Sequence, residues 1–146
     1  MAFTSTAAVL DAIEARVEAL TPSTQVNADD RFQVIIGEPR GQTVPPRTCF
    51  LSAFAGIPNR QGMACYPWTT QVALEVVYLD VPTEAGQPTI AQTAIRDSED
   101  ILADLFTWAS QTDGIDRIDP DTAEVTPMGD GSLSCTRRIR VDFQRA

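Results

Sequence analysis

In the sequence TQVALEVVYL, residues 70–79, apolar side chains alternate with more polar ones. One set holds Val72, Leu74, Val76 and Tyr78, and the other holds Gln71, Ala73, Glu75 and Val77. A period of two residues is typical of a β-strand, because successive side chains of a strand point to opposite faces of its sheet. We therefore expect a strand here, with one face in the core.

The segment 88–110, which follows this strand after a turn, predicts the longest helix of the chain. On a helical projection one arc of about 160° holds its apolar side chains: Ile90, Ala91, Ala94, Ile95, Ser98, Ile101, Leu102, Leu105, Phe106, Trp108 and Ala109. The other arc holds Gln92, Thr93, Arg96, Asp97, Glu99, Asp100, Asp104 and Thr107. Pro88 suits a first helical turn. This segregation predicts a helix that lies along a sheet with its acidic side in solvent.

The remaining patterns complete an α+β fold. A first amphipathic helix is expected over residues 5–20, and further strands over 32–36, 48–54, about 123–127 and about 134–145, the last two joined by the turn Gly129–Gly131. The order α-β-β-β-α-β-β predicts a single domain, residues 1–146, with a mostly antiparallel sheet of four to five strands and two helices packed on one face. The opposite face should then be exposed or used for binding.

Two long connections are expected at about 37–47 and 55–69, since proline and glycine interrupt both segments. Ile115 and Ile118 are assigned to an acidic loop. Tyr66 and Trp68 fall in the second connection. They either pack beneath it or anchor a neighbouring subunit, as exposed aromatic side chains often do.

The charge of the chain restricts its partners. Its 20 acidic and 11 basic residues give a formal net charge of −9, and every base is an arginine. This balance disfavours sequence-independent binding of DNA, which needs a cationic surface. It is compatible with an acidic surface that serves solubility, and with a wall that DNA slides past because like charges repel.

The sequence offers little for catalysis. It has no histidine and no lysine, and we find no nucleophile elbow, phosphate-binding loop or dinucleotide fingerprint. We predict no enzyme activity, no cofactor and no metal site. Cys49, Cys65 and Cys135 are expected to be reduced, buried thiols. The acidic run Asp113, Asp116, Asp119 and Asp121 lacks the pattern of a calcium loop, so a solvated loop is expected. The first residues carry no signal-peptide pattern, and no stretch is apolar enough to span a bilayer.

Arginines of the last strand form a candidate interface. Arg137, Arg138 and Arg140 form a small basic cluster, in which Arg138 and Arg140 share the polar face of the strand. Glu75 occupies the equivalent face of the 70–79 strand. Two interpretations stay open: cross-strand ion pairs within the sheet, or contacts from the arginines to a subunit or partner.

Most of the chain outside 37–68 resembles the tail terminator proteins of long-tailed bacteriophages, also called tail completion or minor tail proteins. The resembling segments are VLDAIEARVEAL, QVALEVVYLD, AIRDSEDILADLFTWA, DGIDRIDPDTAEVTP and TRRIRVDFQ. The resemblance implies a virion protein at the tail–neck junction, assembled in the host cytoplasm. It also implies a homo-oligomeric ring, usually a hexamer, that caps the tail tube, ends its polymerisation and joins it to the neck or head-completion protein. DNA would pass through the ring without specific binding.

The sequence leaves two rival functions open. A neck or head-completion connector of the same phage type is not separated from a terminator by any motif in the chain. A monomeric α+β domain that binds a small ligand or acts as an enzyme is the alternative from another class. Ring formation by the purified protein separates the assembly functions from this last one.

Overall fold

The computed structural model describes residues 2–24, 30–40, 44–58, 66–79, 85–128 and 131–145. The described residues form two helices, α1 (Thr6–Ala19) and α2 (Ile90–Gln111), and six strands. The strands are β1 (Gln33–Ile36), β2 (Thr48–Ala53), β3 (Ile57–Pro58), β4 (Tyr66–Leu79), β5 (Ile115–Pro127) and β6 (Ser132–Arg145).

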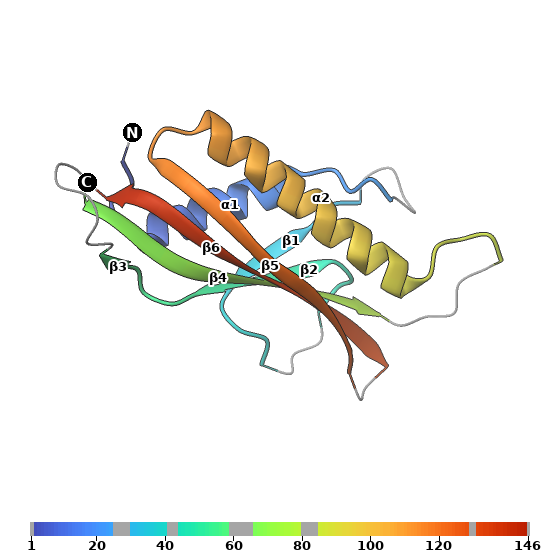
Figure 1. Ribbon diagram of the computed structural model, residues 1–146. Helices are drawn as coiled ribbons and strands as arrows, with labels where there is room; N and C mark the ends of the chain where they lie inside the picture. Colours follow the sequence, from blue (N-terminus) through green and yellow to red (C-terminus); the bar gives the residue numbers. More distant parts are fainter. Residues whose placement is uncertain are drawn as a thin grey trace.

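The strands form one sheet in the order β1-β2-β4-β6-β5, with the short β3 paired to β4. Only β1 and β2 run parallel; the other described pairs are antiparallel. Both helices cover the same side of the sheet, and the described residues of the β1–β2 link leave it on the other side (Figure 1). The predicted α+β class, with a mostly antiparallel sheet and helices on one face, is confirmed, although the sheet has six strands where four to five were expected.

The central strand β4 is longer than predicted. It begins at Tyr66, where a loop was expected up to residue 69, and it pairs with β6 without interruption from Tyr66↔Arg145 to Leu79↔Ser132. The strand tolerates Pro67 because β2 accompanies β4 only from Val72 onward, which leaves the start of β4 close to an edge of the sheet. The prediction of a loop over 55–69 is therefore wrong at β3 and at the start of β4.

The assignment of Ile115 and Ile118 to a loop is also wrong. Both lie in β5, and their side chains are buried against the core. The β5–β6 register shifts between Ile115 and Arg117 and again between Pro120 and Ala123. Such irregularities break the two-residue alternation by which a strand is recognised in a sequence.

The helix α2 begins one residue after its cap, Thr89, whose side chain accepts a hydrogen bond from the Gln92 backbone while the Gln92 side chain accepts one in return. The apolar arc packs on the sheet and the polar arc faces solvent as predicted, with two exceptions in the first arc and one in the second. Asp97, expected in solvent, is fully buried, whereas Ile95 and Phe106 are 46% and 41% exposed. The two exposed apolar side chains lie at the margin of the predicted arc, so they point past the sheet.

The core lies between the helices and the sheet. Its fully buried aliphatic and aromatic side chains come from both helices and from the three central strands: Val9, Ile13, Leu51, Leu74, Leu105, Ile139, Val141 and Phe143. The register carries this apolar face across the sheet, because Leu51 pairs with Leu74 and Val72 pairs with Ile139. The other face of the same strands is therefore left for solvent or for partners.

Candidate functional site

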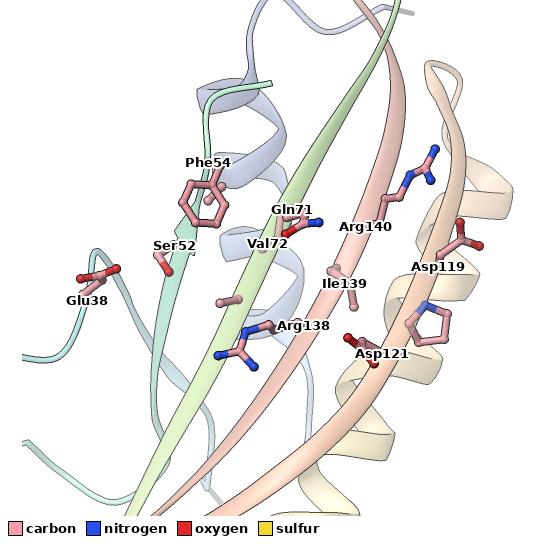
Figure 2. Close-up of a pocket in the computed structure, with 13 residues that line it drawn as sticks. Glu38, Ser52, Phe54, Gln71, Val72, Asp119, Asp121, Arg138, Ile139 and Arg140 are labelled. Atoms are coloured by element: carbon pink, nitrogen blue, oxygen red, sulfur yellow. The ribbon is translucent and has the colours of Figure 1, made fainter. Parts of the chain in front are cut away.

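The sheet face that the helices leave open is hollowed across β2, β4, β6 and β5, with a volume of about 310 Å³ (Figure 2). It is lined by Glu38, Ser52, Ala53, Phe54, Gln71, Val72, Ala73, Asp119, Pro120, Asp121, Arg138, Ile139 and Arg140. The strand alternation places Gln71 and Ala73 here, since their neighbours Val72 and Leu74 point to the core. The volume is at the lower end of the range for small-molecule sites, roughly 300–1,000 Å³. A hollow of this size suits one or two large side chains.

Arg138 lies in the middle of the hollow, with Glu38 on one side and Asp119 and Asp121 on the other (Figure 2). The neighbouring Arg140 is occupied, because its guanidinium Nε donates to Asp142 Oδ1 at 3.1 Å. Arg138 is exposed and has no hydrogen bond or ion pair with any residue that the structure describes. The centre of the hollow thus presents an arginine with its donors available.

The structure lacks the cross-strand ion pairs that one interpretation gave to Glu75. The residue opposite Glu75 on β6 is Thr136, whereas Ala73 lies opposite Arg138 and Gln71 opposite Arg140. Within the described part of the chain, Glu75 makes no ion pair with either arginine. Cross-strand ion pairing within the sheet is therefore wrong for these three residues, and a partner contact through Arg138 stays a prediction. Arg137 points the other way, donating to Ser98 Oγ at 3.0 Å.

The two aromatic residues of the predicted interface have different positions. Tyr66 opens β4, but its side chain lies outside the described residues. Trp68 is half-buried, packs against the core and faces Phe143 across the strand pair. The guanidinium carbon of Arg145 lies 4.3 Å from the centre of the Trp68 ring, a cation–π geometry. Trp68 therefore packs against its own chain as part of strand β4, and not beneath a loop as one interpretation had it; its contact with a neighbouring subunit stays a prediction.

A different aromatic residue lies at the open face. Phe54 follows β2 and lines the hollow, and 76% of its surface is exposed; nearby in the chain Ile57 of β3 is 65% exposed. Phe54 continues the β2 face that carries Ser52, so alternation places these two side chains on the same side of the sheet. Phe54 was not among the predicted interface residues, because nothing in the pattern told an exposed face from a covered one.

A second polar cluster lies inside the core, on the helix side of the sheet. Arg47 Nε donates to Asp97 Oδ2 at 2.9 Å, and the Tyr78 hydroxyl donates to the same oxygen at 2.8 Å. Arg47 also donates to Asp97 Oδ1, to the Thr24 carbonyl and to Asp30. Arg47 has a positive φ of 62°, a left-handed conformation that non-glycine residues seldom adopt. These contacts join the end of the β1–β2 link to β4 and α2.

Burial alters the acidity of this cluster. It raises the pKa of the Asp97 carboxyl, while the hydrogen bond from Tyr78 and the charge of Arg47 oppose that shift. Burial, followed by the nearby charge of Asp97, raises the pKa of the Tyr78 phenol far above its usual range. Every named group is committed to a partner inside the chain, so the cluster is built to hold elements together.

The two cysteines that the structure describes are buried and free. Burial raises the pKa of Cys49 to about 12, with the charge of Glu75 as a smaller cause, and Cys135 is also a buried free thiol. Cys65 lies outside the described residues. Among the residues described, no group of three or more side chains could hold a metal ion. The prediction of a solvated loop for the four aspartates is wrong for three of them, since strand β5 contains Asp116, Asp119 and Asp121.

Comparison with known proteins does not assign the chain to a family. No family model matches it, and the curated proteins contain no match to it. None of the helices in the described part of the chain is long and apolar enough to cross a membrane.

Proposed function

We propose that this chain is a structural subunit of a phage tail, which forms a homo-oligomeric ring on the end of the tail tube. The ring ends tube polymerisation and joins the tail to the neck or head-completion protein. The residue patterns quoted above, from the first helix to the last strand, supply the resemblance on which this proposal rests. The protein has no catalytic part in it.

The observation that carries the proposal is the hollowed open face of the sheet. Arg138 lies at its centre with no partner among the described residues, and the exposed Phe54 ring lies at its margin. Arginine and aromatic side chains are enriched in protein interfaces, where the arginine fork binds carboxylates and the ring supplies contact area. An assembly subunit is a class of protein that needs such a face.

The net charge of −9 also supports the proposal. A ring of acidic subunits around a channel repels the phosphates of DNA, so that the genome passes without being held. The charge supports solubility equally well, and it therefore adds less than the open face does.

The test examines the purified protein alone and with isolated tail tubes. Electron microscopy images rings and tube ends, and native mass spectrometry measures the mass of any assembly. We expect rings, or a cap of density on one end of the tubes. A matched acidic monomeric protein serves as the control for nonspecific binding. Phage assembly without this chain is expected to give overlong tails that carry no heads. Normal virions assembled without the chain would overturn the proposal.

The 310 Å³ hollow favours one rival, a monomeric domain that binds a small anionic ligand at Arg138. The same preparations separate the two functions. A protein that stays monomeric at all concentrations, ignores tail tubes and binds a small carboxylate or phosphate compound is the rival. Rings or capped tubes support the assembly subunit.

A further inference from the structure

The outward face of α2 carries a stripe that is more apolar than a solvated helix face requires. Ile95, Glu99, Ala103 and Phe106 follow one another at spacings of three and four residues, so they share one side of the helix. All four are exposed, Ile95 and Phe106 at 46% and 41% of their surfaces. Glu99 has no hydrogen bond or ion pair with the described residues. The stripe thus presents an available carboxylate between two large apolar side chains.

The hollow on the other side of the molecule contains an arginine that can pair with this carboxylate. The guanidinium of Arg138 lies between Glu38 and Asp121, and Phe54 supplies an exposed ring at the margin of the hollow (Figure 2). Glu38, at its margin, is exposed and likewise has no partner among the described residues, and α2 carries an exposed Arg96 beside Glu99. The stripe therefore offers an available carboxylate with apolar area, and the hollow offers an available arginine with apolar area. Asp119 and Asp121 also line the hollow, and the carboxylate of Asp119 is paired with Arg117.

These surfaces lie on opposite sides of a two-layer fold, since α2 covers one face of the sheet and the hollow is on the other (Figure 1). They cannot meet within one molecule. We infer that the α2 stripe of one copy docks in the hollow of a second copy, with Glu99 of the one paired to Arg138 of the other. This inference rests on the proposed function and names the interface that builds the ring.

A contact between two unlike surfaces has the symmetry that a ring needs. Each copy uses its stripe toward one neighbour and its hollow toward the other, which is a heterologous, head-to-tail interface. Such interfaces close into rings when the rotation between copies allows it, whereas a contact between like surfaces ends at a dimer. Burying a charged pair with apolar side chains around it also excludes water from the ion pair, as in the centre of protein interfaces.

The edges of the sheet are less suited to this task. β5, at one edge, carries Pro120 and Pro127 and two register shifts, and β1, at the other, has four residues. Prolines, irregular registers and short lengths are the features by which proteins prevent strand pairing between molecules. Association by continuation of the sheet is therefore disfavoured.

Charge reversal tests the inference with the full chain. The variants are Arg138→Glu and Glu99→Arg, each of which sets like charges against one another in the proposed pair. We expect each variant alone to associate on the order of 100-fold more weakly than the wild type in analytical ultracentrifugation and native mass spectrometry. Arg31→Glu and Glu18→Arg change the charge equally at exposed positions outside both surfaces, and should associate like the wild type.

Rescue makes the test specific. An equimolar mixture of the two single variants restores opposite charges at every interface if copies alternate, and so does the double variant that carries both changes. We expect both samples to recover the association of the wild type. Recovery in the mixture also shows that each single variant is folded, since only a folded copy can supply its half of the interface.

The outcomes separate this inference from the proposed function. Wild-type rings that persist in both single variants, or single variants that are not rescued by mixing, overturn the Glu99–Arg138 interface and leave the ring in place. A wild type that forms no ring, alone or on tail tubes, overturns both. Loss of small-anion binding in Arg138→Glu, without any association in the wild type, identifies the hollow as a ligand site.

Discussion

Arg47 and Asp97 are fifty positions apart in the sequence, and the guanidinium Nε of Arg47 donates to Asp97 Oδ2 at 2.9 Å. Both residues are shielded from solvent: Asp97 is fully buried and Arg47 is 8% exposed. The pair fixes the end of the β1–β2 link against α2. Glu38, which belongs to the same link, lines the margin of the hollow.

Arg47→Met removes the partner of a buried carboxylate. We expect the free energy of unfolding to fall by about 3–5 kcal/mol, the usual cost of leaving a buried charge uncompensated. Urea denaturation followed by circular dichroism measures the change. Arg16→Met is the matched control, because Arg16 makes a similar two-point contact with Asp104 but both side chains are partly exposed. It should cost roughly 0.2–1 kcal/mol, and equal losses in the two variants would contradict the assigned role of Arg47.

The stability of the protein should carry a pH dependence that originates at Asp97. Burial raises its pKa above the ordinary value of 3.8. A carboxyl with a higher pKa in the folded state binds more protons when folded, so its contribution to stability is full below about 3.8 and is lost as the pH rises through the folded-state value. The free energy of unfolding of the wild type, minus that of Asp97→Asn, should therefore decrease as the pH rises.

The measurement is a series of urea denaturations of both proteins between about pH 4 and pH 7. A difference that grows with pH would mean that Arg47 and Tyr78 outweigh burial and that the pKa of Asp97 is lowered.

The buried thiols should not react in the native state. Burial raises the pKa of Cys49 to about 12 and also raises that of Cys135, and the thiolate is the reactive form. We expect iodoacetamide at mildly alkaline pH to leave both unmodified until a denaturant is added, as read from peptide masses. Modification of Cys49 in the native protein at the rate of a free peptide thiol would contradict its burial.

Gly56 is required by close packing between α1 and β4. A Cβ atom at this position would lie 2.5 Å from Thr6 Oγ1 and 3.0 Å from Trp68 Cε3, and the Gly56 amide already donates to Thr6 Oγ1 at 3.0 Å. We expect Gly56→Ala to lower the free energy of unfolding by about 1–3 kcal/mol, as overpacking does. The same substitution in a Thr6→Ala background should cost less, because the closest clashing atom is gone; an unchanged cost would place the strain at Trp68.

Much of the fold follows from local patterns that sequence reasoning can evaluate. The alternation at residues 70–79 and in the last strand predicts the two strands that cross the middle of the sheet, and the 3.6-residue period predicts both helices. The β4 extension to Tyr66 and the strand at Ile115 could not be predicted in the same way. Both depend on pairing with β6, and a partner strand is a long-range contact that overrides prolines and broken alternation.

The candidate site was predicted only in part. Arg138 and Arg140 lie in the hollow as residues of the polar face, which alternation alone decides. Glu75 is excluded from pairing with them by register, and register depends on how far one strand slides along another. Phe54 was missed because a period of two residues tells which side chains share a face and says nothing of what covers it.

The sequence by itself determined the class of fold, which side chains of a strand share a face and the absence of titratable imidazole and lysine. These properties depend on residue type and on spacing within one element. Tertiary structure alone decided which charges are paired: Asp97 is drawn into the core by Arg47 and Tyr78, Arg140 is occupied by Asp142, and Arg138 is left available. A charge acquires or lacks a partner through contacts between distant segments, and only the folded chain brings those segments together.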